Sequence, residues 1–213
     1  MDMNHNMRWL STIVCLLLLA AVLIPAARGS AQDPGAATAG ESVRDMLDQV
    51  LAIQTDPRLQ DRQHRDERRR AIKAVIARNF HFDGMARQAL GKYGEGLDAS
   101  QRASFLALFQ DLFQDSYTKL VLDFLKRERI LYDREEVAPD RSLIKTRIVR
   151  MSEEIPVEYS LAPVDGKWLV QDVKIDGISI TENYRRSFAR VIQRDSFRVL
   201  LDKMRLQRQA MEK

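Results

Sequence analysis

Few side chains in this sequence are of the types and spacings that could catalyse a reaction or hold a metal. Beyond the N-terminal region the histidines are His64 and His81, which fall in different expected elements and belong to no recognisable ligand motif. No serine stands in a G-x-S-x-G motif, the sharp turn that exposes a hydrolase nucleophile. The sequence therefore gives no support to a metal site or to a serine hydrolase.

An acid–base site is the one catalytic arrangement that the residues leave open. Asp172, Tyr159 and His81 could form such a site if the fold brought them together, as in small cone-shaped α+β isomerases. The alternative is structural, with Asp172 a strand carboxylate and Tyr159 a core ring whose hydroxyl is hydrogen-bonded. The sequence alone does not decide between the two.

The largest apolar feature is the segment 98–127, whose periodicity predicts one long helix. Asp98 and Gln101 have the spacing of a capping box at its start, and Lys126, Arg127 and Arg129 place positive charge at its end. Its apolar side chains cover about half of the circumference, more than the ~100° stripe of a surface helix. These are Phe105, Leu106, Phe109, Leu112, Phe113, Tyr117, Leu120 and Phe124. Such a helix lies at the centre of a core or forms one wall of an apolar cavity.

The N-terminus has the features of a secretory signal peptide. Arg8 precedes an apolar run over 13–24, and Gly29 and Ala31 are the small residues of a cleavage site. The run is shorter than the ~20 residues of a membrane span. We therefore expect cleavage after Ala31, with Gln32 as the first residue of the mature protein.

Composition bounds the class of protein. The 34 basic and 30 acidic residues give a net charge of +4, so the basicity is mild and mixed, and no nucleic-acid partner is expected. The single cysteine, Cys15, lies in the signal peptide, so the mature chain would have no disulfide and no thiol. We divide the chain into a signal peptide (1–31), a flexible leader (32–40) and a single domain (41–213).

Three shorter helices are expected before the long one, at 41–55, 61–80 and 82–91. Asp83 is the expected cap of the third helix and Gly91 its end, followed by a glycine-containing loop around Tyr93. The second helix begins with DRQHRDERRR, which is nearly all charged. This run is either a solvated face with internal charge pairs or a contact for an anionic surface, such as lipid headgroups or an acidic partner.

After the long helix the apolar period changes from 3.6 to 2, which predicts strands at 129–137, 142–151, 154–162 and 168–175. Asp165 and Gly166 form a hairpin signal, and Pro156 suggests an edge strand or a bulge. Asp176–Gly177 interrupts the last strand, and 178–180 is expected to continue it. Helical periodicity returns at 184–192 and 197–206.

The expected fold is α+β, with helices packed on one face of a curved antiparallel sheet. The broad face of the long helix, the dry face of the strands and the tail helices supply more apolar surface than a two-layer core needs. The excess favours an enclosed apolar site.

Several segments resemble the MlaC family, also known as toluene-tolerance proteins. They are FDGMARQALGKY, the aromatic helix with Gln101, PVEYSL, and WLVQDVKIDGISITENYRRSFARVI, and the resemblance runs from about Val43 to Leu201. Two positions depart from the family pattern: Tyr93 stands where tryptophan is frequent, and Asp195–Ser196 where glycine is common.

The resemblance implies a nuclear-transport-factor-2-like fold that encloses phospholipid acyl chains and leaves the headgroup in water. It implies a periplasmic carrier of Gram-negative bacteria that maintains outer-membrane lipid asymmetry. The implied partners are an outer-membrane lipoprotein–porin complex and the substrate-binding subunit of an inner-membrane ABC transporter. No cofactor and no reaction are implied, and we expect a monomer.

The resemblance and the apolar pattern together give a set of residues that could line the lipid cavity, although each could equally be ordinary core. The set is Val75, Met85, Leu90, Tyr93, Phe105, Phe109, Leu112, Phe113, Tyr117, Ile148, Val157, Tyr159, Val173, Ile175, Tyr184 and Phe188. Two other classes of function stay open: an isomerase-type enzyme of the cone fold, and a periplasmic adaptor with a filled core and no ligand.

Overall fold

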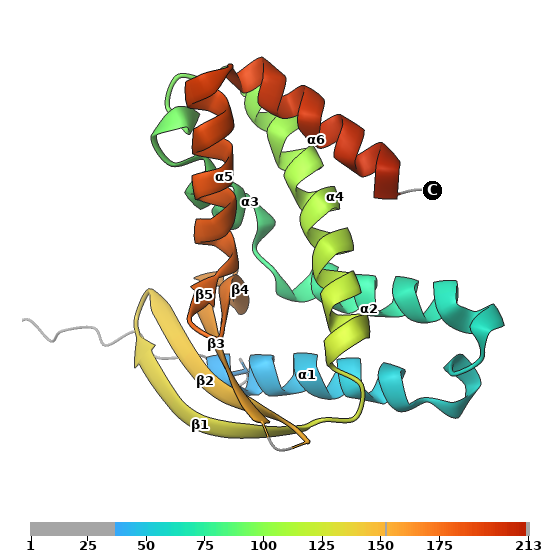
Figure 1. Ribbon diagram of the computed structural model, residues 1–213. Helices are drawn as coiled ribbons and strands as arrows, with labels where there is room; N and C mark the ends of the chain where they lie inside the picture. Colours follow the sequence, from blue (N-terminus) through green and yellow to red (C-terminus); the bar gives the residue numbers. More distant parts are fainter. Residues whose placement is uncertain (1–36, 152, 212–213) are drawn as a thin grey trace, which may run out of the picture. The chain divides into compact units, whose positions relative to one another are not determined.

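The computed structural model describes residues 37–151 and 153–211, which form α-helices and one antiparallel sheet (Figure 1). The helices are α1 (Ala39–Thr55), α2 (Arg65–Asn79), α3 (Phe82–Leu90), α4 (Ala99–Phe124), α5 (Ile180–Arg194) and α6 (Phe197–Met211). The strands are β1 (Arg129–Ala138), β2 (Arg141–Arg150), β3 (Glu153–Val164), β4 (Lys167–Ile175) and β5 (Ile178–Ser179). Short 3₁₀ turns occur at Pro57–Leu59, Arg62–His64 and Gly91–Gly94. The predicted α+β class is confirmed.

The expected signal peptide, 1–31, lies outside the described residues. Helix α1 begins at Ala39, two residues before the expected start, because Thr38 caps it. The Thr38 hydroxyl accepts a hydrogen bond from the Glu41 amide (3.1 Å), and the Glu41 carboxylate accepts one from the Thr38 amide (2.7 Å). This reciprocal pair is a capping box.

The strands follow one another as an antiparallel meander in the order β1-β2-β3-β4-β5. Asp165 (φ 49°) and Gly166 (φ 77°) make the predicted turn between β3 and β4. Asp176 and Gly177 repeat this geometry, so the chain reverses and β5 pairs with β4 instead of continuing it, which corrects the expectation for 178–180.

Pro156 is not on an edge strand, as its presence suggested, because β3 lies between β2 and β4. The irregularity of the β3–β4 pairing falls at Ser160 and Leu161 instead. The Pro156 carbonyl accepts a hydrogen bond from the Asp176 amide (2.9 Å) just beyond the end of β4. The two backbone groups of one residue in an antiparallel strand face the same side. The N–H that proline lacks would therefore have pointed to the end of the ladder, where its loss costs least.

Of the two helix caps predicted from the sequence, one is confirmed and one is wrong. The predicted capping box of α4 is confirmed, with Gln101 N–H donating to Asp98 Oδ1 (2.8 Å) and Asp98 N–H to Gln101 Oε1 (3.0 Å). The predicted cap Asp83 of α3 is wrong: that helix begins after His81, and Asp83 forms an ion pair with Arg87 one turn on. Gly91, at φ 52°, ends α3 as expected.

The end of α4 is held by a buried amide and not by the basic residues that follow it. The Gln54 side chain, 6% exposed on α1, donates from Nε2 to the carbonyls of Val121 (3.2 Å) and Leu125 (2.7 Å). The Val121 carbonyl also accepts the backbone N–H of Leu125 (2.9 Å), whereas the Leu125 carbonyl lies past the last helical hydrogen bond and takes its donor from Gln54. Gln54 thereby joins α1 to the last turn of α4.

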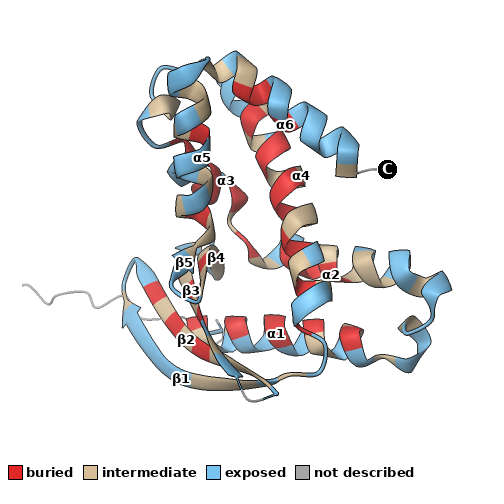
Figure 2. Ribbon diagram, viewed as in Figure 1, coloured by how far each residue is buried: buried red, intermediate tan, exposed pale blue. Residues whose placement is uncertain are grey.

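The first half of α4 forms the centre of the core. Phe105, Phe109 and Phe113 are each 1% exposed, and rings from other elements pack on them. Figure 2 shows buried positions along much of α4. Tyr184 and Phe188 of α5 meet these rings edge to face, with centroids 5.4 and 5.5 Å from Phe109 and Phe105 respectively. Helix α6 packs on α4, and α5 packs on α3 and β4.

Replacing Gln54 with leucine tests the joint between α1 and α4. Gln54→Leu removes the amide donor and leaves the Leu125 carbonyl without it, so we expect the free energy of unfolding to fall by about 1–3 kcal/mol. Urea denaturation would show a lower midpoint at an unchanged slope. Gln49→Leu, at an exposed position of the same helix, is the control and should change stability by less than about 0.5 kcal/mol. Equal losses in the two variants would contradict the role assigned to Gln54.

Candidate functional site

An apolar cavity of about 240 Å³ lies between α1, the second half of α4 and one face of the sheet. Its lining is Met46, Leu47, Val50, Ile76, Tyr117, Leu120, Val121, Phe124, Leu125, Ile148, Ile155, Val157, Tyr159 and Ile175. No charged side chain is among them. A cavity of this kind can hold hydrocarbon, and its lining offers no charged side chain to an ion.

Simple periodicities bring these residues to one place. On α4, Tyr117, Leu120, Val121 and Phe124 follow the i, i+3, i+4, i+7 spacing of one helix face. On β3, the lining residues alternate with Pro156 and Glu158, which point to the other face of the sheet. Cross-strand pairing then extends the lining sideways, since Ile148 lies opposite Ile155 and Val157 lies opposite Ile175.

The cavity reaches the surface at the end of α4. Phe124 lines it and is still 50% exposed, and the Arg150 guanidinium lies 5.7 Å from the centroid of its ring. Met151, the next residue along the chain, is 93% exposed at the β2–β3 turn. The opening therefore has an apolar rim with a cation beside it.

Two tyrosines bring the only hydroxyl groups to the lining, and each satisfies the other. Tyr117 and Tyr159 are 8% and 2% exposed, and their hydroxyls are hydrogen-bonded to each other. Burial raises the pKa of both phenols above the ordinary value of about 10. Both rings are thus neutral at physiological pH, and the cavity wall stays apolar.

The structure brings some of the predicted lining residues together and separates others. Tyr117, Ile148, Val157, Tyr159 and Ile175 line the cavity. Leu90 and Phe105 line a different cleft, of about 540 Å³, beside α3 and the start of α4. The hydroxyl of Tyr93 accepts a hydrogen bond from Gln193 Nε2 (2.6 Å), away from the cavity lining. The remainder pack within or against the core: Val75, Met85, Leu112, Phe109, Phe113, Val173, Tyr184 and Phe188.

Sequence reasoning missed the contribution of α1 to the cavity. Met46, Leu47 and Val50 have the helical spacing of one face of the expected helix 41–55, but periodicity does not say what that face covers. Leu120 and Phe124 belonged to the broad apolar face of the long helix and were not assigned to the lining. The missing information was which half of α4 meets other rings and which half meets empty space.

The residues of the candidate acid–base site do not meet. The Asp172 carboxylate accepts hydrogen bonds from the Ser179 hydroxyl (2.5 Å) and the Thr181 amide (2.9 Å), at the start of α5. Tyr159 lies opposite Val173 in the cavity wall, so Asp172, one residue earlier, faces the other side of β4. His81 contacts Gln171 through Nδ1 (3.1 Å), and burial lowers its pKa. Asp172 has the structural role of a helix cap.

Within residues 37–151 and 153–211 no group of three or more histidine, aspartate or glutamate side chains has the arrangement to hold a metal ion. No helix in the same ranges is long and apolar enough to cross a membrane.

The fold and the cavity define a class: an α+β protein in which helices close an apolar cavity against an antiparallel sheet. The family model of the MlaC protein matches residues 44–206. The chain therefore belongs to the MlaC family, which confirms the resemblance found in the sequence.

One of the matching solved structures is a phospholipid-binding protein from Ralstonia solanacearum, determined in complex with a phospholipid. It has a TM-score of 0.70 and 21% sequence identity, and the match covers 83% of this chain and 100% of that one. A likeness at this identity shows the fold. A search of curated protein sequences finds no match to the chain.

The tyrosine pair predicts a loss of stability in alkali. The unfolded chain releases phenolic protons near the ordinary pKa of about 10, whereas the folded protein holds them to higher pH. Stability is therefore complete below about pH 10 and falls as pH rises above it. In Tyr117→Phe/Tyr159→Phe this fall should be smaller, leaving the part due to Tyr132 and Tyr184, whose pKa values burial also raises. Urea denaturation between about pH 8 and pH 11 measures it, and equal slopes in variant and wild type would refute the assignment.

Proposed function

We propose that this protein is a phospholipid carrier that binds acyl chains in the apolar cavity. The observation that carries the proposal is the cavity itself: it is lined without a single charge and reaches the surface at a half-exposed Phe124. The MlaC family and the lipid-bound structure of similar fold support it. Tyr117, Ile148, Val157, Tyr159 and Ile175 contact the chains directly.

The physics of lipid transfer explains why a protein cavity is needed. Two acyl chains carry ~30 methylenes, and exposing them to water would cost on the order of 25 kcal/mol at ~0.8 kcal/mol each. Transfer between membranes by free diffusion is therefore negligible. A carrier has to offer the chains an environment about as apolar as a bilayer, so that lipid is both taken up and released.

The cavity has to widen when lipid enters. Its 240 Å³ lies below the ~300–1,000 Å³ of sites for drug-sized ligands, and a diacyl lipid is larger than such ligands. The wall best placed to move is the last turn of α4 with Phe124 and Leu125, because it borders the opening and Phe124 is half-exposed. Such a movement has to break the hydrogen bonds that Gln54 donates there. The headgroup stays in water beside Arg150, at the rim.

The finer function follows from the family resemblance and the N-terminal sequence. Residues 1–31 direct export to the periplasm, and residues 41–213 form a single phospholipid-binding domain. The carrier moves glycerophospholipids between an outer-membrane lipoprotein–porin complex and the substrate-binding subunit of an inner-membrane ABC transporter, and so maintains outer-membrane lipid asymmetry. It catalyses no reaction: the one acid–base arrangement that the sequence left open is dispersed over separate elements.

Lipid content after purification tests the proposal. Protein prepared from the periplasm without detergent should release close to one diacyl phospholipid per chain on organic extraction, identified by mass spectrometry. A lipid-free protein that also takes up no lipid from vesicles would overturn the carrier and favour a ligand-free adaptor.

A tryptophan in the cavity tests the site within the same assay. Ile155→Trp places a large ring in the lining near the opening and should reduce lipid content several-fold, because the ring occupies space that the acyl chains need. The matched control is Glu158→Trp, which adds the same ring to the opposite face of β3 and should retain lipid. Both variants are first shown to be folded by circular dichroism. Equal lipid content in the two would exclude this cavity as the acyl site.

A further inference from the structure

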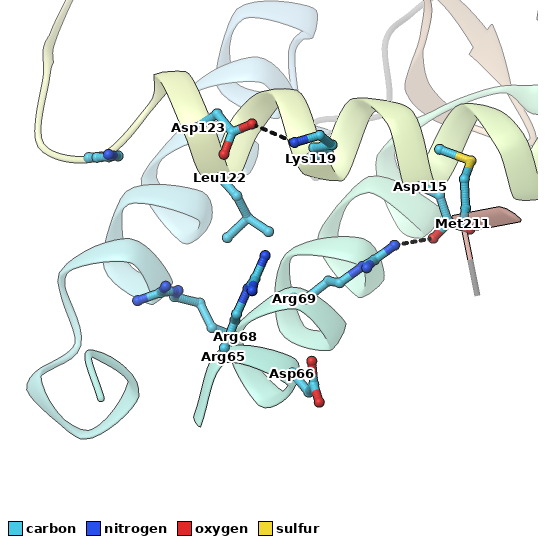
Figure 3. Close-up of a pocket in the computed structure, with 10 residues that line it drawn as sticks. Arg65, Asp66, Arg68, Arg69, Asp115, Lys119, Leu122, Asp123 and Met211 are labelled. Atoms are coloured by element: carbon cyan, nitrogen blue, oxygen red, sulfur yellow. Dashed lines mark hydrogen bonds and ion pairs between the residues drawn. The ribbon is translucent and has the colours of Figure 1, made fainter. Parts of the chain in front are cut away.

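A second, basic hollow lies on the face of α4 opposite the apolar cavity. Two adjoining depressions, of about 570 and 470 Å³, share Arg68, Leu122 and Lys126 and form one groove between the start of α2 and the end of α4. Figure 3 shows the larger depression, with Leu122 pointing from α4 toward the α2 arginines. We call this surface the basic groove; its cations are Arg65, Arg68, Arg69, Lys119, Lys126 and Arg127.

Most acidic groups of the basic groove are already neutralised. Asp115 pairs with Arg69 (3.3 Å) and with Lys73 (2.9 Å). Asp123 pairs with Lys119 (3.1 Å). Glu128 accepts hydrogen bonds from the backbone amides of Lys126 and Arg127, and hydrogen bonding to them lowers its pKa against the opposing effect of burial. Glu128 also pairs with Arg150 (3.9 Å), so Asp66 is the one carboxylate of the groove without an ion pair to another described residue.

Four cations of the basic groove are left without a carboxylate. Arg65, Lys126 and Arg127 form no side-chain ion pair with any described residue. Arg68 donates to the carbonyl of Leu59 (3.1 Å), and its buried Nε has no hydrogen-bond partner there. Ion pairs within the chain therefore neutralise only some of the charges at the start of α2.

The form of the basic groove selects the kind of partner. A bilayer surface is a plane and cannot enter a hollow between two helices, whereas a projecting peptide segment can. Arginine guanidinium groups present paired donors that match carboxylates. Leu122 adds an apolar contact between the cations. We propose that the basic groove binds an acidic segment of a partner protein, with its carboxylates on Arg65, Arg68 and Lys126 and an apolar side chain on Leu122.

The basic groove lies next to the apolar cavity, so a segment bound in the groove can affect the cavity. Gln54 lines the smaller depression and donates to the carbonyls of Val121 and Leu125, whose side chains line the apolar cavity. A segment bound in the basic groove therefore contacts the turn of chain that closes the cavity. This proposal goes beyond lipid binding and does not depend on the carrier function.

Peptide binding tests the proposal directly. The probe is a short fluorescein-labelled peptide of glutamate and alanine around one leucine, and its binding is followed by fluorescence anisotropy at low salt. We expect Arg65→Glu/Lys126→Glu to weaken binding by about tenfold or more. The control, Arg70→Glu/Arg198→Glu, makes the same charge change at exposed positions outside the basic groove and should bind as wild type does. Added salt should weaken binding in wild type and control.

The following outcomes would overturn the proposal. Absence of binding to wild type at low salt, equal weakening in the two variants, or equal binding of the peptide with glutamine in place of glutamate would exclude an acidic-segment site. If the groove variant instead loses binding to phosphatidylglycerol vesicles while its peptide binding is unchanged, the surface contacts membranes. The lipid content of both variants, measured by extraction, should equal that of wild type, so a failure here is distinct from a failure of the carrier function.

Discussion

The packing of aromatic rings on the first half of α4 is the interaction on which the rest of the structure depends. Phe105, Phe109 and Phe113 are enclosed by rings from α5 and by Phe80 (5.4 Å between centroids with Phe113). Such pairs contribute about 0.5–1.5 kcal/mol each beyond the burial of their surface. This half fixes the helix firmly, so the second half can stand away from the sheet and leave a cavity. A helix packed equally along its length would leave no space for a ligand.

Local signals in the sequence predicted the elements well because they act over a few residues. The Asp98 capping box, the Asp165–Gly166 turn and the alternation in β3 depend only on neighbours, and the structure has all three. Residues such as Phe109 were assigned to the cavity because they share a helix with Tyr117. Their neighbours come from α5, far along the chain, and no local signal records that contact. The lining was thus predicted better on the strands, where four of the five predicted residues line the cavity, than on α4, where only Tyr117 does.

The end of α4 shows how one contact changes the role of others. Basic residues after a helix ordinarily interact with its last carbonyls. Here Gln54 occupies those carbonyls, so Lys126 and Arg127 are not needed there. Their side chains instead join the arginines of α2 in the basic groove. A single buried amide in this way separates an uncharged face of the helix from a positively charged one.

The neutral character of that amide has a consequence for the response of the protein to its surroundings. Charge-based attraction at the surface fades as ions are added, with a screening length of about 10 Å at 0.1 M. The hydrogen bonds of Gln54 carry no net charge and are buried, so ionic strength and pH hardly affect them. A change in salinity would therefore alter how strongly the charged face of α4 attracts other molecules. The buried hydrogen bonds that hold the end of α4 beside the cavity would keep their strength.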